Sequence, residues 1–253
     1  MIEYRNIVQG TSQWAAIRAG IPTASCFSKI MTPGKRKSSS QEGYMNQLLA
    51  ERMLGRPIDG YRSQPMEDGN RFEENAVAAY EFAHGVTTYR VGFVLTDDRK
   101  IGCSPDRFIE EKPDRALEAK APSNPAIHVS YLRASTGAME EYICQLMGQL
   151  WTCEKEHVDI ISFFAGMPDA TFSVSRDEAF IKELAAHVRS FSNRLEELSA
   201  DFEARGWIKP HLSADNSDLE DSRAWITQED ADAVLRDAFP EAYREMEGER
   251  KEY

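Results

Sequence analysis

Residues Gly102 to Lys120 read GCSPDRFIEEKPDRALEAK, a segment that contains an S-P-D and an E-A-K pattern. Asp106 follows a proline directly, and Glu118 and Lys120 stand on either side of a single alanine. Successive side chains of a β-strand point to opposite faces, so Glu118 and Lys120 would share one face while Ala119 points away. If Asp106 lies on the neighbouring strand of a hairpin, two carboxylates and one ammonium group converge.

Such a group of side chains is suited to metal-dependent chemistry. The carboxylates, with the main-chain carbonyl of Ala119 as a further ligand, can hold a hard divalent cation. Lys120 would then orient an attacking water and stabilise a developing negative charge. These are the components of a metal-dependent phosphodiesterase. A charged surface hairpin can carry the same short pattern by chance. Other parts of the sequence are therefore needed to distinguish a phosphodiesterase site from a surface hairpin.

The composition indicates a globular protein with a hydrophobic core. The chain has 253 residues, of which 42% are hydrophobic, enough for one large domain or a domain with an appendage. No segment is long and apolar enough for a membrane span, and the N-terminus has no signal-like apolar core, so we expect a cytoplasmic protein. Four cysteines without a C-x-x-C pair indicate reduced thiols, namely Cys26, Cys103, Cys144 and Cys153.

The net charge of −12 argues against a nucleic-acid partner, but its distribution weakens that objection. Residues 201–253 hold 15 acidic and 7 basic side chains, which leaves residues 1–200 with a net charge of −4. A nearly balanced domain can still gather arginine and lysine at one groove. Carboxylates that bind a metal also add negative charge when the ion is absent. DNA binding therefore remains open.

Hydrophobic periodicity and turn residues predict an α/β core, with a central mixed β-sheet flanked by helices. We expect helices at 9–19, 23–31, 44–54, 66–84, 140–151, 177–205 and 227–247, and strands at 89–96, 101–110, 116–120, 157–165 and 171–174. The first three strands would be antiparallel, with a turn at 112–115, and would carry the suspected site. After Pro122 the chain is expected to be irregular at first. The predicted domains are 1–209 and an acidic helical extension at 210–253.

Two basic regions in the first fifty residues are candidates for anion binding. Arg18 ends a predicted helix, and Thr23 and Ser25 open the next, where free main-chain N–H groups favour an anion. Arg18 with Ser25 could therefore bind a phosphate, although helix caps and a surface arginine are the commoner roles of these residue types. The loop at 32–42 carries three basic residues that could reach a DNA backbone or simply be solvated, namely Lys35, Arg36 and Lys37.

Two helix residues are candidates that depend on the fold. Glu73 gains a role only if its helix covers the strands that carry Asp106, since most helix glutamates are solvated. Gln145 has the spacing of a surface polar residue, but it could order a water or a phosphate.

Five short motifs occur in chain order. They are W-x-x-I-R-x-G-x-x-T-A-S (Trp14, Ile17, Arg18, Gly20, Thr23, Ser25), G-x-x-x-E-x-x-A (Gly69, Glu73, Ala76), S-P-D (Ser104, Pro105, Asp106), E-x-K (Glu118, Ala119, Lys120), and Y-x-x-Q with a later tryptophan (Tyr142, Gln145, Trp151). Each is weak alone. Together, from Gln9 to Phe164, they resemble the phage lambda type of exonuclease, the YqaJ-like viral recombinase family of the PD-(D/E)xK nuclease superfamily.

The resemblance implies a restriction-endonuclease-like fold and a specific activity. The family degrades one strand of linear double-stranded DNA from its 5′ end, using Mg²⁺, and leaves a 3′ overhang for a single-strand annealing partner. Two ions are expected, with Mn²⁺ as a substitute. The family also implies a ring-shaped homo-oligomer, commonly a trimer. It further implies a phage or prophage origin, with action in the cytoplasm of a bacterial host.

The resemblance also assigns roles to individual residues. Metal would be held by Asp106, Glu118, the Ala119 carbonyl and Glu73, while Lys120 would position the water and Gln145 would order it. The 5′-phosphate pocket would be formed by Arg18, Ser25 and Ser104, with Thr23 beside them. The family carries a basic residue a few positions after the lysine, and this chain does not. His128 and Arg133 are the candidates to replace that basic residue.

Three alternatives follow from the same residues. An iron–sulfur nuclease of the superfamily would need four clustered cysteines. A structure-specific DNA endonuclease would use the same carboxylates, and a non-catalytic DNA-end adaptor would not need all four catalytic residue types that are present.

The acidic extension, with Trp225, Phe239 and Tyr243, could dock an annealing protein or a neighbouring subunit, or it could pack on its own domain.

Overall fold

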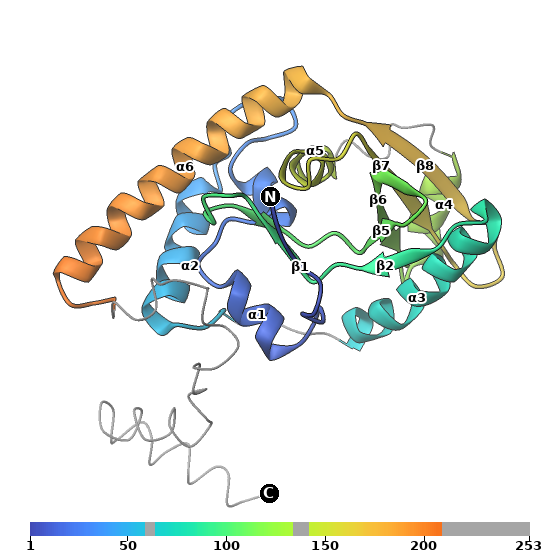
Figure 1. Cartoon of the computed structure of the whole chain (residues 1–253), viewed down its shortest axis with the longest axis horizontal. Helices are drawn as coiled ribbons and strands as arrows, with labels where there is room; N and C mark the ends of the chain where they lie inside the picture. Colours follow the sequence, from blue (N-terminus) through green and yellow to red (C-terminus); the bar gives the residue numbers. More distant parts are fainter. Residues whose placement is uncertain (59–63, 134–141, 209–253) are drawn as a thin grey trace, which may run out of the picture. The chain divides into compact units, whose positions relative to one another are not determined.

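The structure is a computed structural model that describes residues 1–58, 64–133 and 142–208 (Figure 1). Its elements in order are β1 (Ile2–Tyr4), α1 (Ser12–Arg18), the 3₁₀ helix η1 (Ala24–Lys29), α2 (Gln41–Leu54), α3 (Gln64–His84), β2 (Thr88–Arg90), β3 (Phe93–Leu95), β4 (Gly102–Cys103), β5 (Arg107–Ile109), β6 (Lys112–Lys120), α4 (Pro125–Arg133), α5 (Ile143–Thr152), β7 (His157–Ser162), β8 (Ala170–Ser175) and α6 (Glu178–Ala204). The helix expected at 227–247 and the boundary after residue 209 lie outside the described residues.

The strands form two sheets. A three-stranded antiparallel sheet has the order β1-β3-β4, and a five-stranded sheet has the order β2-β5-β6-β7-β8. In the larger sheet β6 and β7 run parallel, and all other neighbours run antiparallel. The predicted α/β class with a mixed central sheet is therefore confirmed.

Helices cover both faces of the five-stranded sheet (Figure 1). On one face α3 packs with Ala76, Val77 and Tyr80 against Ile109, Leu117, Ala119 and Ile161. On the other face α5 packs with Leu146, Met147 and Leu150 against Ala116, Val158 and Ile160. Residues along β6 thus alternate between the two helices, as the two-residue period of a strand requires.

The predicted hairpin is split between the two sheets, which corrects the expectation of continuous strands at 89–96 and 101–110. β2 and β5 join the larger sheet, whereas β3 and β4 join the smaller one. A Cβ atom on Gly92 would lie 2.1 Å from the Ile7 carbonyl oxygen, so the loop after β1 crosses directly over Gly92. Pro105 has no N–H group to continue a strand ladder. Asp106 therefore lies at the crossing between the sheets.

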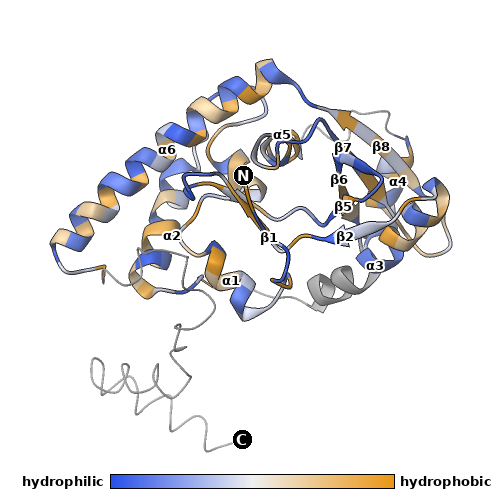
Figure 2. Ribbon diagram, in the orientation of Figure 1, coloured by the Kyte–Doolittle hydropathy of each residue, from blue (hydrophilic) through white to orange (hydrophobic). Residues whose placement is uncertain are grey.

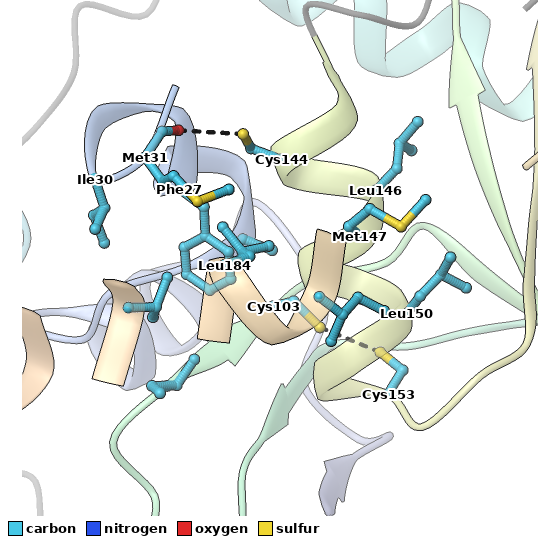
Figure 3. Packing of buried hydrophobic residues seen from close by; sticks show 14 of the residues in the cluster. Phe27, Ile30, Met31, Cys103, Cys144, Leu146, Met147, Leu150, Cys153 and Leu184 are labelled. Carbon is cyan, nitrogen blue, oxygen red and sulfur yellow. Dashed lines mark hydrogen bonds between the residues drawn. The ribbon is translucent and has the colours of Figure 1, made fainter. Parts of the chain in front are cut away.

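The core continues from α5 to η1 and α6 (Figure 3). Gly148 lets α5 approach η1 closely, because a Cβ atom there would lie 2.5 Å from Cδ2 of Phe27. Hydrophobic and hydrophilic residues alternate along α6 (Figure 2), and its buried side carries Leu184, Val188, Phe191 and Leu195. The position of α5 is thus fixed from three sides, by the sheet, η1 and α6.

Three local expectations were wrong. Residues 23–31 do not form an α-helix, since only a six-residue 3₁₀ helix is present. The turn before β6 falls at residues 110–111 rather than 112–115. The segment after Pro122 forms α4, which begins at Pro125 and is capped by the Asn124 side chain accepting from the Ala126 N–H at 2.9 Å. Proline in a first turn after an asparagine is a helix-start signal that was available in the sequence.

Two class-level expectations can also be compared with the structure. None of the helices in the described ranges is long and apolar enough to cross a membrane. All four cysteines are free, and three of them are buried. The loop at 32–42 begins with a short turn, which is closed by a bridge between Met31 and Lys37.

We predict that Gly92→Ala destabilises the fold, because its methyl group would meet the main-chain oxygens of Ile7 at 2.1 Å and Tyr4 at 2.8 Å. Forced overpacking of this kind should lower the free energy of unfolding by about 1–3 kcal/mol, as measured by urea denaturation. The control is Gly43→Ala in the exposed part of α2, where a Cβ atom meets no heavy atom of the described residues within 4 Å. That variant should gain about 0.5–1 kcal/mol. Equal stability of the two variants would contradict the prediction.

Candidate functional site

The centre of the site is the carboxylate of Glu118 on β6. Its side chain is buried on the face toward α5 and accepts three hydrogen bonds. Oε1 accepts from Nζ of Lys120 at 2.6 Å and from Nε2 of Gln145 at 2.7 Å, while Oε2 accepts from Nε2 of Gln149 at 2.8 Å. Glu118 and Lys120 therefore share one face of the strand, as their spacing predicts, and Gln145 joins them from α5.

Asp106 reaches the same strand from the crossing between the sheets. Its Oδ2 accepts a hydrogen bond from the main-chain N–H of Ala119 at 2.8 Å. Gln9 fixes the preceding residue by donating from Nε2 to the Pro105 carbonyl at 2.8 Å and to the Val91 carbonyl at 2.7 Å. Arg107 donates to the carbonyl of Asp106 at 2.9 Å. The backbone on both sides of Asp106 is thus held in place.

The carboxylates influence one another electrostatically. Burial raises the pKa of Asp106 well above its usual range, and the negative charge of Glu118 raises it further. Burial also raises the pKa of Glu73 on α3, against the opposing effect of Lys120. Glu73 therefore lies within electrostatic reach of the site, as expected if α3 covers the strand that Asp106 contacts. Three carboxylates and one ammonium group leave the site with surplus negative charge.

Lys120 remains a cation in the environment of these carboxylates. Burial would lower its pKa, but Glu118 and Asp106 outweigh that effect and raise the pKa above its usual value. Its ammonium group also lies 5.3 Å from the centre of the Tyr142 ring. The side chain can donate hydrogen bonds and stabilise negative charge, and it is a poor general base at neutral pH.

The donor chemistry suits a hard cation, because oxygen ligands with surplus negative charge are what Mg²⁺ and Ca²⁺ prefer. Within residues 1–58, 64–133 and 142–208, however, no three histidine, cysteine, aspartate or glutamate side chains are grouped as a ready-made metal site. Glu118 is engaged by three donors and Asp106 by a main-chain N–H. The sulfur atoms of Cys103 and Cys153 lie 3.2 Å apart, but the described residues contain no group of three cysteines of the kind that an iron–sulfur nuclease needs.

The N-terminal block is brought close to this site. The guanidinium group of Arg18 lies over the Trp14 ring at 3.9 Å, and Nε1 of Trp14 donates to Oγ of Ser104 at 3.0 Å. Ser104 is two residues from Asp106. Burial lowers the pKa of Arg18, and its Nε has no hydrogen-bond partner among the described residues. Arg18 and Ser104, predicted from motif order to act together, are thus connected through Trp14.

The other residues predicted for this pocket differ in exposure. Thr23 is buried and donates its N–H to the Tyr44 hydroxyl at 3.2 Å, which indicates a packing role. Ser25 is exposed, and its hydroxyl lies 3.4 Å from that of Thr23. Because η1 is a short 3₁₀ helix, an anion here would depend on side chains rather than on a helix N-terminus.

Several predicted DNA-binding residues do not join the site. His128 is fully buried, with Nδ1 2.8 Å from the Ser162 hydroxyl and Nε2 2.9 Å from the Pro168 carbonyl, so it packs inside the protein instead of facing DNA. Arg133 is exposed at the end of α4. The basic turn is exposed near the start of α6, where Nζ of Lys35 lies 5.3 Å from the Phe180 ring centre; it also carries Arg36 and Lys37.

Two residues at the site were missed from the sequence. Gln149 is not one of them, because helical spacing already places it one turn after Gln145 on the same side of the helix. Gln9 and Arg107 act on the backbone around Asp106, and no spacing rule marks either of them. Arg107 also pairs with Glu74 of α3 at 2.6 Å, which ties the crossing to that helix.

The family model described as the YqaJ-like viral recombinase domain matches residues 13–156. Among curated proteins, none matches the chain significantly.

Solved structures also match the fold. An alkaline exonuclease from Laribacter hongkongensis, LHK-Exo, matches with a TM-score of 0.67 and 25% identity over 78% of this chain and 98% of that chain. LHK-Exo in complex with dAMP matches with the same TM-score and 26% identity, over the same shares of the two chains. A phage related exonuclease from Haemophilus somnus 129PT matches with a TM-score of 0.56 and 13% identity, over 72% and 96% of the two chains, which supports the fold alone.

We predict that Asp106→Asn stabilises the protein in the absence of divalent cations. Burial and Glu118 disfavour the charged carboxylate, whereas an amide oxygen can still accept from the Ala119 N–H. The melting temperature in EDTA at pH 8 should rise by about 2–4 °C, the shift that about 1 kcal/mol produces in a domain of this size. Because the pKa is raised in the folded state, wild-type stability falls as the pH rises through it, and the variant should lack this component.

The control for this experiment is Asp169→Asn, at an exposed position before β8, which should leave the melting temperature unchanged. A lower melting temperature for Asp106→Asn than for the wild type would show that the charge of Asp106 is not disfavoured in the fold.

Proposed function

Because the chain belongs to the YqaJ-like viral recombinase family, we propose that it is a DNA exonuclease that uses a divalent metal ion. The proposal rests on the position of Asp106. Its carboxylate accepts a hydrogen bond from the Ala119 N–H and lies within electrostatic reach of the Glu118–Lys120 pair. The mixed sheet with helices on both faces is the restriction-endonuclease-like core of the matched exonucleases. Fold, family and site chemistry therefore agree on nuclease activity.

The proposed reaction is 5′-to-3′ digestion of one strand of linear double-stranded DNA, which leaves a 3′ overhang for annealing. Motif order supports this specific form of the activity. The relative LHK-Exo has been solved with dAMP, a deoxynucleoside monophosphate, and mononucleotides are the products that stepwise digestion releases. Action in the cytoplasm of a phage-infected or lysogenic bacterium, with a single-strand annealing protein as partner and a trimeric ring as assembly, belongs to the same proposal.

The metal ions are proposed to be Mg²⁺, two per site, with Mn²⁺ as a substitute. Asp106, Glu118 and the Ala119 carbonyl would hold the first ion, and Glu73 would serve the second. Bound there, such ions supply an activated water and neutralise charge on the scissile phosphate. The surplus of carboxylates over cations at the site supports this assignment, because a divalent cation would relieve their mutual repulsion.

The remaining side chains have roles of their own. Lys120 is cationic, so it donates hydrogen bonds to the phosphate region and stabilises the negative charge that builds up there. Gln145 donates one amide hydrogen to Glu118 at 2.7 Å. The second hydrogen on the same nitrogen remains available to orient the attacking water.

Selection of the DNA end is proposed to depend on Arg18, with Ser25 and Ser104. The Trp14 ring supports the Arg18 guanidinium from one face, and the Nε–H of Arg18, which has no partner among the described residues, is a donor that a phosphate oxygen could satisfy. Charge-assisted hydrogen bonds from arginine to phosphate are among the stronger polar contacts in proteins. An end that carries a 5′-phosphate would therefore be held with its first phosphodiester bond toward Asp106.

Digestion of end-labelled duplexes tests the proposal. With Mg²⁺ we expect a 5′ label to be released as a mononucleotide and a 3′ label to remain in long, partly single-stranded products. Circular duplex should not be cut. Asp106→Ala should lower the rate by about a thousandfold or more while linear duplex is still bound, since loss of a metal ligand removes several kcal/mol of transition-state stabilisation. Asp169→Ala is the matched control. Internal cuts in circular DNA would favour an endonuclease, and end binding without digestion would favour an adaptor.

We predict that Arg18→Gln removes the preference for 5′-phosphorylated ends. Loss of a hydrogen bond to a charged group, worth about 1.5–3 kcal/mol, should slow digestion of phosphorylated duplex by about 10- to 100-fold and leave duplex with a 5′-hydroxyl unaffected. The comparison variant is Arg194→Gln, since Arg194 is exposed and pairs with Glu42 on α2. An equal loss on both kinds of end would mean that Arg18 contributes to folding or general DNA binding instead.

A further inference from the structure

Gln149 is a buried polar side chain whose role neither the motif order nor the proposed reaction accounts for. It lies on α5 one helical turn after Gln145 and is 2% exposed. Its Nε2 donates to Oε2 of Glu118 at 2.8 Å. Its own amide oxygen has no hydrogen-bond partner within the part of the chain that the structure describes.

The two oxygens of Glu118 have different surroundings. Oε1 accepts from Lys120 and Gln145, which are both partly exposed. Oε2 accepts from the fully enclosed Gln149. The two glutamines, four residues apart on one side of α5, thus approach the carboxylate from the same helix and engage one oxygen each. Together they fix the plane of the carboxylate.

The orientation of the Gln149 amide carries a cost. A carboxylate only accepts hydrogen bonds, so the NH₂ group of Gln149 must face Glu118 and the amide oxygen must point elsewhere. A buried acceptor left without a partner destabilises the fold, whereas an apolar residue of similar size would fill the same space without that penalty. Packing alone therefore does not explain a glutamine at this position.

The backbone that carries Gln149 is rigidly held. Gly148 is in such close contact with η1 that a Cβ atom would lie 2.5 Å from Cδ2 of Phe27, and Leu150 is fully buried on the next position. The backbone at Gln149 is thus held on both sides, and the buried amide donates to Oε2 from this fixed position. Fixed supporting groups of this kind are what precise metal sites require.

We propose that Gln149 is a positioning residue that holds Oε2 of Glu118 on the buried side and so presents Oε1, on the partly exposed side, to a metal ion. The inference rests on the proposed metal-dependent function and adds a residue to it. It does not involve contact of Gln149 with DNA or with the ion. Its effect should therefore show in metal affinity before it shows in DNA affinity.

The test uses Gln149→Met in the full chain, because methionine keeps the length of the side chain and removes the donor. Titration with Mn²⁺, followed by the electron paramagnetic resonance signal of the free ion, should show about tenfold weaker binding than in the wild type. The kcat at a fixed, low Mn²⁺ concentration should fall with little change in KM for duplex DNA. Activity should recover as the Mn²⁺ concentration is raised.

The matched control is Gln47→Met. Gln47 makes the same kind of bond on α2, from Nε2 to Oε1 of Glu51 four residues later at 3.0 Å, away from the metal-binding carboxylates. It should keep the Mn²⁺ affinity of the wild type. Gln149→Leu, also without a donor, repeats the measurement if Gln149→Met does not fold, and circular dichroism establishes which variants are folded.

The outcomes separate the two proposals. A folded Gln149 variant with wild-type Mn²⁺ affinity would overturn the positioning role while the wild-type protein still digests DNA. A wild-type protein that neither binds Mn²⁺ nor digests DNA would overturn the proposed function and the positioning role together. Weaker Mn²⁺ binding in the Gln149 variants alone, with recovery of activity at high Mn²⁺, supports both.

Discussion

The hydrogen bond from the Ala119 N–H to Oδ2 of Asp106, at 2.8 Å, is the contact on which the arrangement of the site depends. It joins the segment that crosses between the two sheets to the central strand β6. The crossing itself exists because Gly92 leaves room for the loop after β1 and because Pro105 cannot continue a strand ladder. The same local features that interrupt the hairpin therefore deliver a carboxylate to Glu118 and Lys120.

Much of this could be predicted from the sequence because it follows from local periodicity. The alternation along E-A-K places Glu118 and Lys120 on one face, and helical spacing identifies the buried side of α6. The order of short motifs supplied the family, since no single motif is specific. Arg18 and Ser104 were predicted to act together, and Trp14 connects them physically.

The parts that could not be predicted involve contacts between distant segments. Nothing near Gln9 in the sequence indicates that its amide spans the carbonyls of Val91 and Pro105. The division of one hairpin between two sheets depends on the loop after β1, which passes over Gly92. Ile7 in that loop and Gly92 lie about 85 residues apart in the sequence. A histidine such as His128 is suited to bind an anion, but the packing of α4 buries its ring against Ser162 and Pro168.

The site combines strong constraint with unrelieved charge. Glu118 receives three hydrogen bonds and Asp106 receives a main-chain one, yet burial and mutual repulsion still raise the pKa of Asp106 and Glu73. Lys120 offsets one of the three carboxylates. Selection for stability alone would favour apolar residues in place of these buried charged side chains. In the proposed function, the negative charge that destabilises the protein without a cation is the charge that would attract one, so stability and metal affinity would be coupled through these three carboxylates.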